Sequence, residues 1–218
     1  QIIYFLLGLT FLVFTFEILP IFYGVKNSIR KNTRDFFLYQ TLRGVFSVML
    51  GTTFLIMFKV FRVDYGIIDI HQLPLFLQVI ILYLCSEFVI YVFHFMSHKY
   101  RLPGLSKAHK FHHTITSDME WVNSRKEHLL VISVFVFVFC LFFYIIFESS
   151  SLANFIVLSV FLLLLSFSHY RLPLFIPYLD KIFLFPKDHL RHHTSWGGPY
   201  GVTLSIFDTI FGTRDKVK

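Results

Sequence analysis

The sequence predicts an all-α, polytopic membrane protein with about 4–5 transmembrane helices and a cytoplasmic, histidine-rich cap that holds two metal ions. Three observations lead to this fold class. The chain of 218 residues is 56% hydrophobic, with a mean hydropathy of +0.66, which is well above the apolar share of a soluble domain. Several apolar runs are long enough to cross a bilayer. Ten of its 11 histidines fall at or beyond the same ends of those runs.

Five apolar runs are each expected to form a helix. Residues 129–147 carry no charge over 19 positions, about the length that crosses the hydrocarbon core as a helix. A buried helix of a soluble protein explains one such run, but several in so short a chain favour a membrane. The expected helices span about residues 2–23, 42–61, 73–95, 129–147 and 152–167.

The basic residues predict the orientation of these helices. If the helices alternate in direction, 18 of the 20 lysines and arginines lie on one side, in residues 24–43, 96–128 and 168–218. Basic loops stay in the cytoplasm, where they can also touch anionic lipid headgroups. The net charge of +7 therefore reflects membrane topology, and we expect no nucleic-acid partner.

Two histidine runs share one spacing. "HKFHH" occupies 109–113 and "HLRHH" occupies 189–193, while "HFMSH" places His94 and His98 four residues apart. At the histidine content of this chain, a chance match to His-x-x-His-His is expected about 0.03 times. Residues three and four apart share one face of a helix, so two or three imidazoles of each run can reach one point.

The number of imidazoles predicts two metal ions. Eight to ten ligands exceed the coordination of one ion and suit two ions with open positions; imidazole binds iron, zinc, copper and nickel. The zinc motif His-Glu-x-x-His and the di-iron motif Glu-x-x-His are both absent from the sequence. The spacing of the histidines therefore does not decide between iron and zinc, and haem held by two histidines is a third alternative. The candidate metal ligands are His94, His98, His109, His112, His113, His128, His169, His189, His192 and His193.

The order of these motifs resembles the fatty acid hydroxylase / sterol desaturase superfamily, which comprises integral membrane, histidine-rich di-iron oxygenases. The resemblance includes "MEWVNSRKEHLL" (119–130), "SHYRLP" (168–173) and "PYGVTLSIFDTIFGT" (199–213). It implies residues 1–72 as N-terminal transmembrane helices and loops, and 73–218 as the catalytic domain, integrated into one membrane domain.

By resemblance, the protein hydroxylates or desaturates a lipid C–H bond with dioxygen. It would bind two non-haem iron ions, with zinc able to occupy the site in a purified protein, and would take electrons from a separate donor of the cytochrome b5 or ferredoxin type. The expected membrane is the endoplasmic reticulum in a eukaryote or the inner membrane in a bacterium. The expected catalytic residues are the motif histidines His94, His98, His109, His112, His113, His189, His192 and His193.

Three other functions remain open on the residues alone: a bis-histidine haem electron carrier, a zinc-dependent membrane hydrolase, and a metal-binding or transport protein. Two carboxylates are candidate supports for the ligands. Glu87 precedes His94 by seven residues, on the same helical stripe, and is expected to orient a ligand imidazole. Asp188 is expected either to cap the helix of the last run or to accept a hydrogen bond from a ligand. Trp196 and Tyr200 are candidates for the substrate mouth or for a structural turn.

Overall fold

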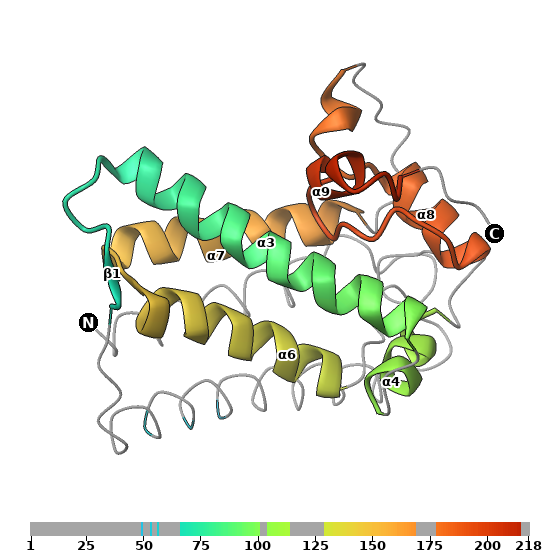
Figure 1. The fold of residues 1–218 in the computed structure, drawn as a ribbon, viewed down its shortest axis with the longest axis horizontal. Helices are drawn as coiled ribbons and strands as arrows, with labels where there is room; N and C mark the ends of the chain where they lie inside the picture. Colours follow the sequence, from blue (N-terminus) through green and yellow to red (C-terminus); the bar gives the residue numbers. More distant parts are fainter. Residues whose placement is uncertain are drawn as a thin grey trace, which may run out of the picture. The chain divides into compact units, whose positions relative to one another are not determined.

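The computed structural model describes residues 49, 53, 56, 66–100, 104–113, 129–168 and 178–214. The described residues are mostly helical (Figure 1), as the sequence predicted. They belong to two compact units: residues 1–83 with 132–160, and residues 84–131 with 161–218. The first two expected helices lie outside the described residues, apart from three single positions.

Helix α3, Leu75–Lys99, is the longest element. Its 25 residues span about 37 Å at 1.5 Å per residue, more than the hydrocarbon core of a bilayer. Among the described residues it is the one helix long and apolar enough to cross a membrane. The helix begins after Pro74, whose carbonyl accepts hydrogen bonds from the backbone of Leu77 and Gln78. It ends at Lys99, four residues beyond the expected end at 95, and so includes His98.

The first unit contains a helical hairpin. Helix α6 (Leu129–Cys140) leads into the π-helix η1 (Leu141–Ile146), and after strand β2 (Phe147–Glu148) helix α7 (Ser151–Ser168) reverses the chain (Figure 1). The 129–147 and 152–167 helices were thus predicted closely, except for the π-helical segment. Strand β1 (Ile68–Asp69) pairs in parallel with β2, a short ladder that the all-α prediction did not include.

A buried glutamine joins the turns of this unit. Gln78 donates hydrogen bonds to the carbonyls of His71 and Leu73 at 3.1 and 2.7 Å and accepts one from the Ser150 amide at 2.9 Å. The buried amide therefore satisfies backbone groups of two loops at once, and it fixes the start of α3 beside the turn into α7.

The second unit carries the shorter helices. Helix α4 (Leu105–His112) follows Gly104, whose φ of +79° only glycine adopts readily. The 3₁₀ turn η2 (Leu179–Lys181) leads through a bridge between Phe183 and Leu204 to helix α8 (Pro186–Ser195). Pro186 lacks an amide hydrogen and suits the first position of that helix. The short helix α9 (Ile206–Ile210) closes the unit.

Candidate metal centre

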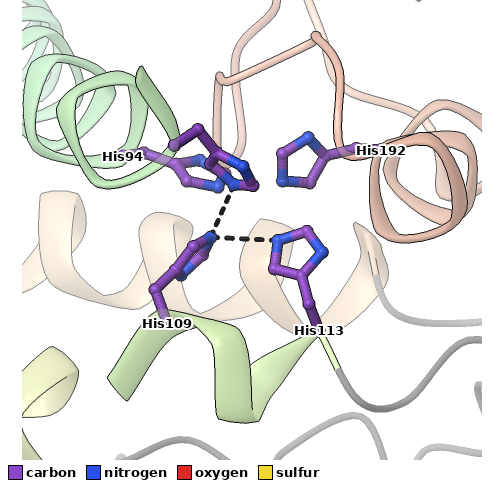
Figure 2. Close-up of side chains that lie close together, drawn as sticks. His94, His109, His113 and His192 are labelled. Carbon is purple, nitrogen blue, oxygen red and sulfur yellow. Dashed lines mark hydrogen bonds between the residues drawn. The ribbon is translucent and has the colours of Figure 1, made fainter. Parts of the chain in front are cut away.

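All eight motif histidines of the second unit come together. They form two groups, within each of which the ligand nitrogens lie within 4.8 Å of one another. One group has five members: His94, His98, His109, His113 and His192. The other has three: His112, His189 and His193. Figure 2 shows the rings of His94, His109, His113 and His192 turned toward one another from three segments of the chain.

Each His-x-x-His-His run is divided between the two groups. His109 and His113 join the group of five, while His112 joins the group of three; in the second run His189 and His193 join the group of three, and His192 crosses to the group of five. Neighbouring residues of a helix point about 100° apart, whereas residues four apart point the same way. The adjacent His-His pair therefore lets each run contribute candidate ligands to both groups.

The spacing between imidazole nitrogens fits shared ions. Nε2 of His109 lies 2.8 Å from Nε2 of His98 and 3.0 Å from Nε2 of His113, and the Nε2 atoms of His189 and His193 are 3.1 Å apart. Imidazoles bound side by side to one ion at 2.0–2.1 Å place their nitrogens about 2.8–3.4 Å apart, depending on coordination geometry. The nitrogens are thus already spaced as neighbouring ligands of one ion.

Two ligands are oriented by backbone carbonyls. Nδ1 of His94 donates to the carbonyl of Tyr200, and Nδ1 of His192 donates to the carbonyl of Gly197, both at 2.7 Å. A carbonyl can only accept, so each bond places the proton on Nδ1 and leaves a lone pair on Nε2. Both Nε2 atoms are buried without a hydrogen-bond partner, as metal ligands need to be.

Burial favours the neutral form of several candidate ligands of the group of five. Desolvation, joined by the mutual repulsion of neighbouring imidazoles, lowers the pKa of His109 and of His192 well below the usual value. Desolvation also lowers the pKa of His113 to about 4. Neutral imidazole is the form that binds metal, so the fold holds these side chains ready for ions at neutral pH.

A buried aspartate that the sequence did not single out organises the carbonyl beneath His94. Asp208 is fully buried and accepts hydrogen bonds from the amides of Tyr200 and Gly201 at 2.7 Å and from the Thr213 hydroxyl at 2.6 Å. Burial raises the pKa of Asp208, and the hydrogen bonds oppose the shift. Asp208 therefore holds the turn that presents the Tyr200 carbonyl. The one available signal was its place in the 199–213 segment.

Glu87 acts on the same loop. It is fully buried, accepts a short hydrogen bond from the Thr203 hydroxyl, and lies 3.5 and 3.4 Å from the amides of Thr203 and Leu204. The sequence argument expected Glu87 to orient a ligand imidazole. These partners belong to the loop and not to an imidazole, so Glu87 acts on His94 indirectly. It stabilises the loop whose Tyr200 carbonyl accepts the hydrogen bond from His94.

Asp188 does not cap its helix. The N-cap of α8 is Phe185, so Asp188 lies in the first turn, where a carboxylate favours the positive end of the helix dipole. It pairs with Arg191 at 3.7 Å, with that arginine side chain 37% exposed, so the pair contributes little to stability. Of the two expected roles, the cap is wrong and the support of a ligand stays a prediction.

A cavity of about 700 Å³ opens beside the group of five. His98 lines it and is the half-exposed member of that group, whereas every member of the other group is buried. Trp196 and Tyr200 also line it, and Trp196 is at the same time the left-handed C-cap of α8. The Trp196 indole stacks on the His113 imidazole at 4.7 Å between ring centroids. The group of five is thus the one that the cavity reaches.

Two candidate ligands, His128 and His169, lie outside the described residues, as do most of the motif segments 119–130 and 168–173. Their proposed ligation stays a prediction. His71, the one histidine outside the candidate ligands, is exposed on a turn of the first unit before α3.

The comparison with protein families agrees with the geometry of the histidine groups. No match was found among curated proteins or among solved structures. The model of the family described as fatty acid hydroxylase matches residues 79–213, a stretch that includes all ten candidate ligands. This match covers more than half of the chain, and the chain therefore belongs to the fatty acid hydroxylase family.

Proposed function

We propose that this protein is a membrane-bound oxidoreductase that hydroxylates or desaturates a C–H bond of a lipid, using dioxygen, two non-haem iron ions and electrons from a separate protein. Membership of the fatty acid hydroxylase family supports the reaction class. The single observation that carries the metal assignment is the division of the histidine runs into two adjoining groups.

The two groups are close enough to serve one reaction. His113 of the group of five stacks on His193 of the group of three, with ring centroids 4.4 Å apart. Both groups consist of imidazole nitrogens, a donor set that suits iron. When bound, the two irons would supply the redox change and the activation of dioxygen that side chains cannot provide.

The chain itself holds and shields the site. His94 and His192 are fixed by carbonyl groups, so their Nε2 atoms point at one place without rearrangement. Asp208 and Glu87 hold the loop behind them. The cavity beside His98 is lined mainly by aromatic rings, which exclude water from the reacting carbon and suit a lipid that arrives from the bilayer.

The geometry favours this function over the two catalytic or redox alternatives. A haem iron needs two imidazoles on opposite faces of a flat ring, whereas here five imidazoles lie with their nitrogens within 4.8 Å of one another. A catalytic zinc site uses three protein ligands and a water. The group of three would satisfy that need, and the group of five exceeds it.

The proposed setting is an integral membrane protein with several spans and the metal site on the cytoplasmic side. Helix α3 is long enough to cross a bilayer and has His94 and His98 in its last turns. The site would then lie at the membrane surface, where a soluble or peripheral donor of the cytochrome b5 or ferredoxin type can reach it.

The test combines metal analysis with lipid profiling. We expect purified protein to contain two irons per chain and to show no Soret band. Cells that express the wild type are expected to contain an oxidised lipid that is missing when His112→Ala is expressed at an equal level. Full lipid oxidation after stoichiometric removal of iron would overturn the proposal, and activity without dioxygen or a reductant would favour a hydrolase.

A further inference from the structure

Trp196 is an exposed aromatic residue at the edge of the candidate metal centre. It is the C-cap of α8 and is 42% exposed, although burial of an indole is strongly favourable. Its φ of +56° lies in the left-handed region, which bulky side chains rarely adopt. Tyr178 shares both properties, with 79% exposure and a φ of +74°. What distinguishes Trp196 is therefore the set of residues that it contacts.

Trp196 contacts three members of the group of five. Its indole stacks on the His113 imidazole, with ring centroids 4.7 Å apart and 29° between the ring planes. It also meets the edge of the His98 ring, with the centroids 5.7 Å apart. The Trp196 amide donates a hydrogen bond to the carbonyl of His192 at 3.1 Å. A single residue thus leads from the surface to three candidate ligands through direct contacts.

The imidazoles themselves are poorly accessible to another protein. Four members of the group of five are buried, and the fifth, His98, is half-buried. A protein that exchanges electrons with a metal in this group has to approach it through exposed residues that contact the ligands. Within the described part of the chain, Trp196 is the one exposed aromatic residue whose ring contacts these imidazoles.

The surface around this residue is basic. None of the four carboxylates described in the second unit is exposed. Five lysines of that unit are exposed: Lys99, Lys107, Lys110, Lys181 and Lys187. Lys99 directly follows His98 and lines the same cavity as Trp196. Lys110 directly follows His109 on α4. Opposite charges steer and orient two partners at an interface, so this surface suits an acidic protein.

We propose, resting on the proposed function, that an acidic electron-carrier protein docks on Trp196 and passes electrons through its indole to the metal held by the group of five. Each encounter oxidises the redox centre of the donor by one electron and reduces that metal by one electron, while Trp196 is chemically unchanged. Two encounters supply the two electrons that, with two protons, reduce one oxygen atom of dioxygen to water as the other oxidises the lipid.

Two features of Trp196 favour a protein partner over the membrane surface. Tryptophan is among the residues that anchor protein interfaces, and redox partners form small, transient interfaces that one such anchor can centre. Tryptophan and lysine also occur at membrane surfaces, but a headgroup contact does not require the indole to stack on a candidate ligand. The stacking on His113 gives electronic contact with the metal centre, and only a redox partner makes use of it.

Docking can be measured without turnover. The probe is the acidic soluble haem domain of cytochrome b5, and the metal-loaded full chain is held in nanodiscs of neutral phosphatidylcholine. We expect saturable binding that weakens roughly tenfold when the salt rises from about 50 to about 300 mM, and we expect no binding of the basic haem protein cytochrome c. Equal binding of the two haem proteins would overturn the proposal.

Matched variants locate the docking site. Trp196→Leu and Lys99→Glu are each expected to weaken the binding of the cytochrome b5 domain about fivefold or more. Tyr178→Leu removes an exposed aromatic residue with the same backbone conformation, and we expect less than about a twofold change. Lys187→Glu is the charge control, because Lys187 begins α8 about 13 Å along the helix from Trp196, beyond the screening length. Equal effects of Trp196→Leu and Tyr178→Leu would overturn the site.

The electron path is timed by anaerobic stopped flow without lipid. Reduced cytochrome b5 domain is mixed with saturating iron(III)-loaded protein, so that docking does not limit the rate, and haem oxidation is followed per bound iron. We expect Trp196→Leu to slow this step about tenfold. Trp196→Phe keeps a ring against His113 and is expected to slow it only about threefold. A wild-type rate in Trp196→Leu would overturn the path through the indole.

A membrane contact would give a different fluorescence result. The chain has two tryptophans, so zinc-loaded Trp121→Phe protein reports Trp196 alone. In nanodiscs, aqueous iodide is expected to quench this fluorescence more strongly than nitroxide-labelled headgroups do. Stronger quenching by the headgroup label would place the indole on the membrane and overturn the docking site.

These measurements separate the two proposals. Docking and electron transfer that depend on Trp196, without lipid oxidation in cells, would support the electron path and overturn the proposed function. Lipid oxidation at the wild-type rate in Trp196→Leu would support the function and overturn the electron path.

Discussion

His94 donates a hydrogen bond from Nδ1 to the carbonyl of Tyr200 at 2.7 Å, although the two residues are 106 positions apart. The contact orients a candidate ligand of α3 through a turn that Asp208 holds from beneath. Asp208 and Glu87, both buried, therefore act on the candidate metal centre through the backbone between Tyr200 and Leu204.

The first prediction concerns Asp208. Asp208→Asn replaces an acceptor of three hydrogen bonds with an amide that cannot accept all of them, so the Tyr200 carbonyl should lose its fixed position. We expect metal affinity to fall about 10- to 100-fold, as measured by competition with a chelator. Asp180→Asn is the control, because Asp180 pairs with Arg214 at 2.8 Å and is not among the groups that hold the turn. Equal affinities in the two variants would contradict the role of Asp208.

The second prediction concerns the tight turn at Gly201. A Cβ atom there would lie 1.9 Å from the Leu204 carbonyl oxygen and 2.8 Å from Oδ2 of Asp208. Gly201→Ala must therefore shift the backbone, and we expect it to lower the free energy of unfolding by about 2–4 kcal/mol, seen as a lower melting temperature in detergent. Gly212→Ala meets no atom within 4 Å but has a φ of +61°, so a cost of only about 1–2 kcal/mol is expected. A larger loss of unfolding free energy in Gly212→Ala than in Gly201→Ala would contradict the predicted clash at Gly201.

The third prediction separates the adjacent histidines. His193→Ala leaves two ligands in the group of three, whereas His192→Ala leaves four in the group of five. We expect the first variant to bind about one metal ion per chain and the second to retain close to two with weaker binding of one of them. Metal content after dialysis against a weak chelator measures this difference. Identical stoichiometry and affinity in the two variants would show that the runs are not divided.

The fourth prediction concerns pH. Burial lowers the pKa of His113 to about 4 and the pKa of His109 and His192 well below the usual value. A histidine with an ordinary pKa near 6.5 gains a proton between pH 7 and pH 6 and then competes with the metal. These three stay neutral, so they should leave the metal affinity nearly unchanged from pH 8 to pH 6. A chelator titration measures the affinity for the ion held by the group of five. A fall in that affinity of more than tenfold between pH 8 and pH 6 would contradict the low pKa of these three histidines.

Much of the fold and site follows from local patterns in the sequence. The apolar runs at 73–95, 129–147 and 152–167 predicted α3, α6 with η1, and α7, because apolar length and helical propensity are properties of neighbouring residues. The His-x-x-His-His spacing likewise placed several imidazoles on one helical face, and the structure brings all eight motif histidines into two groups. Family membership rests on the same local motifs.

Long-range packing decided the rest. Helical periodicity states which residues share a face, but it does not state which other segment that face meets. The separation of His112 from His113, the bond from His94 to Tyr200, and the roles of Asp208 and Glu87 all depend on where distant parts of the second unit lie. The cavity beside His98 depends on the same packing, because its walls come from two distant segments, residues 88–99 and 196–213. Residue type and spacing were thus sufficient for three of the expected helices, for the candidate ligands as a set and for the family. The path of the chain was needed to assign each of the eight motif histidines to its group and each of the two carboxylates Glu87 and Asp208 to its partners.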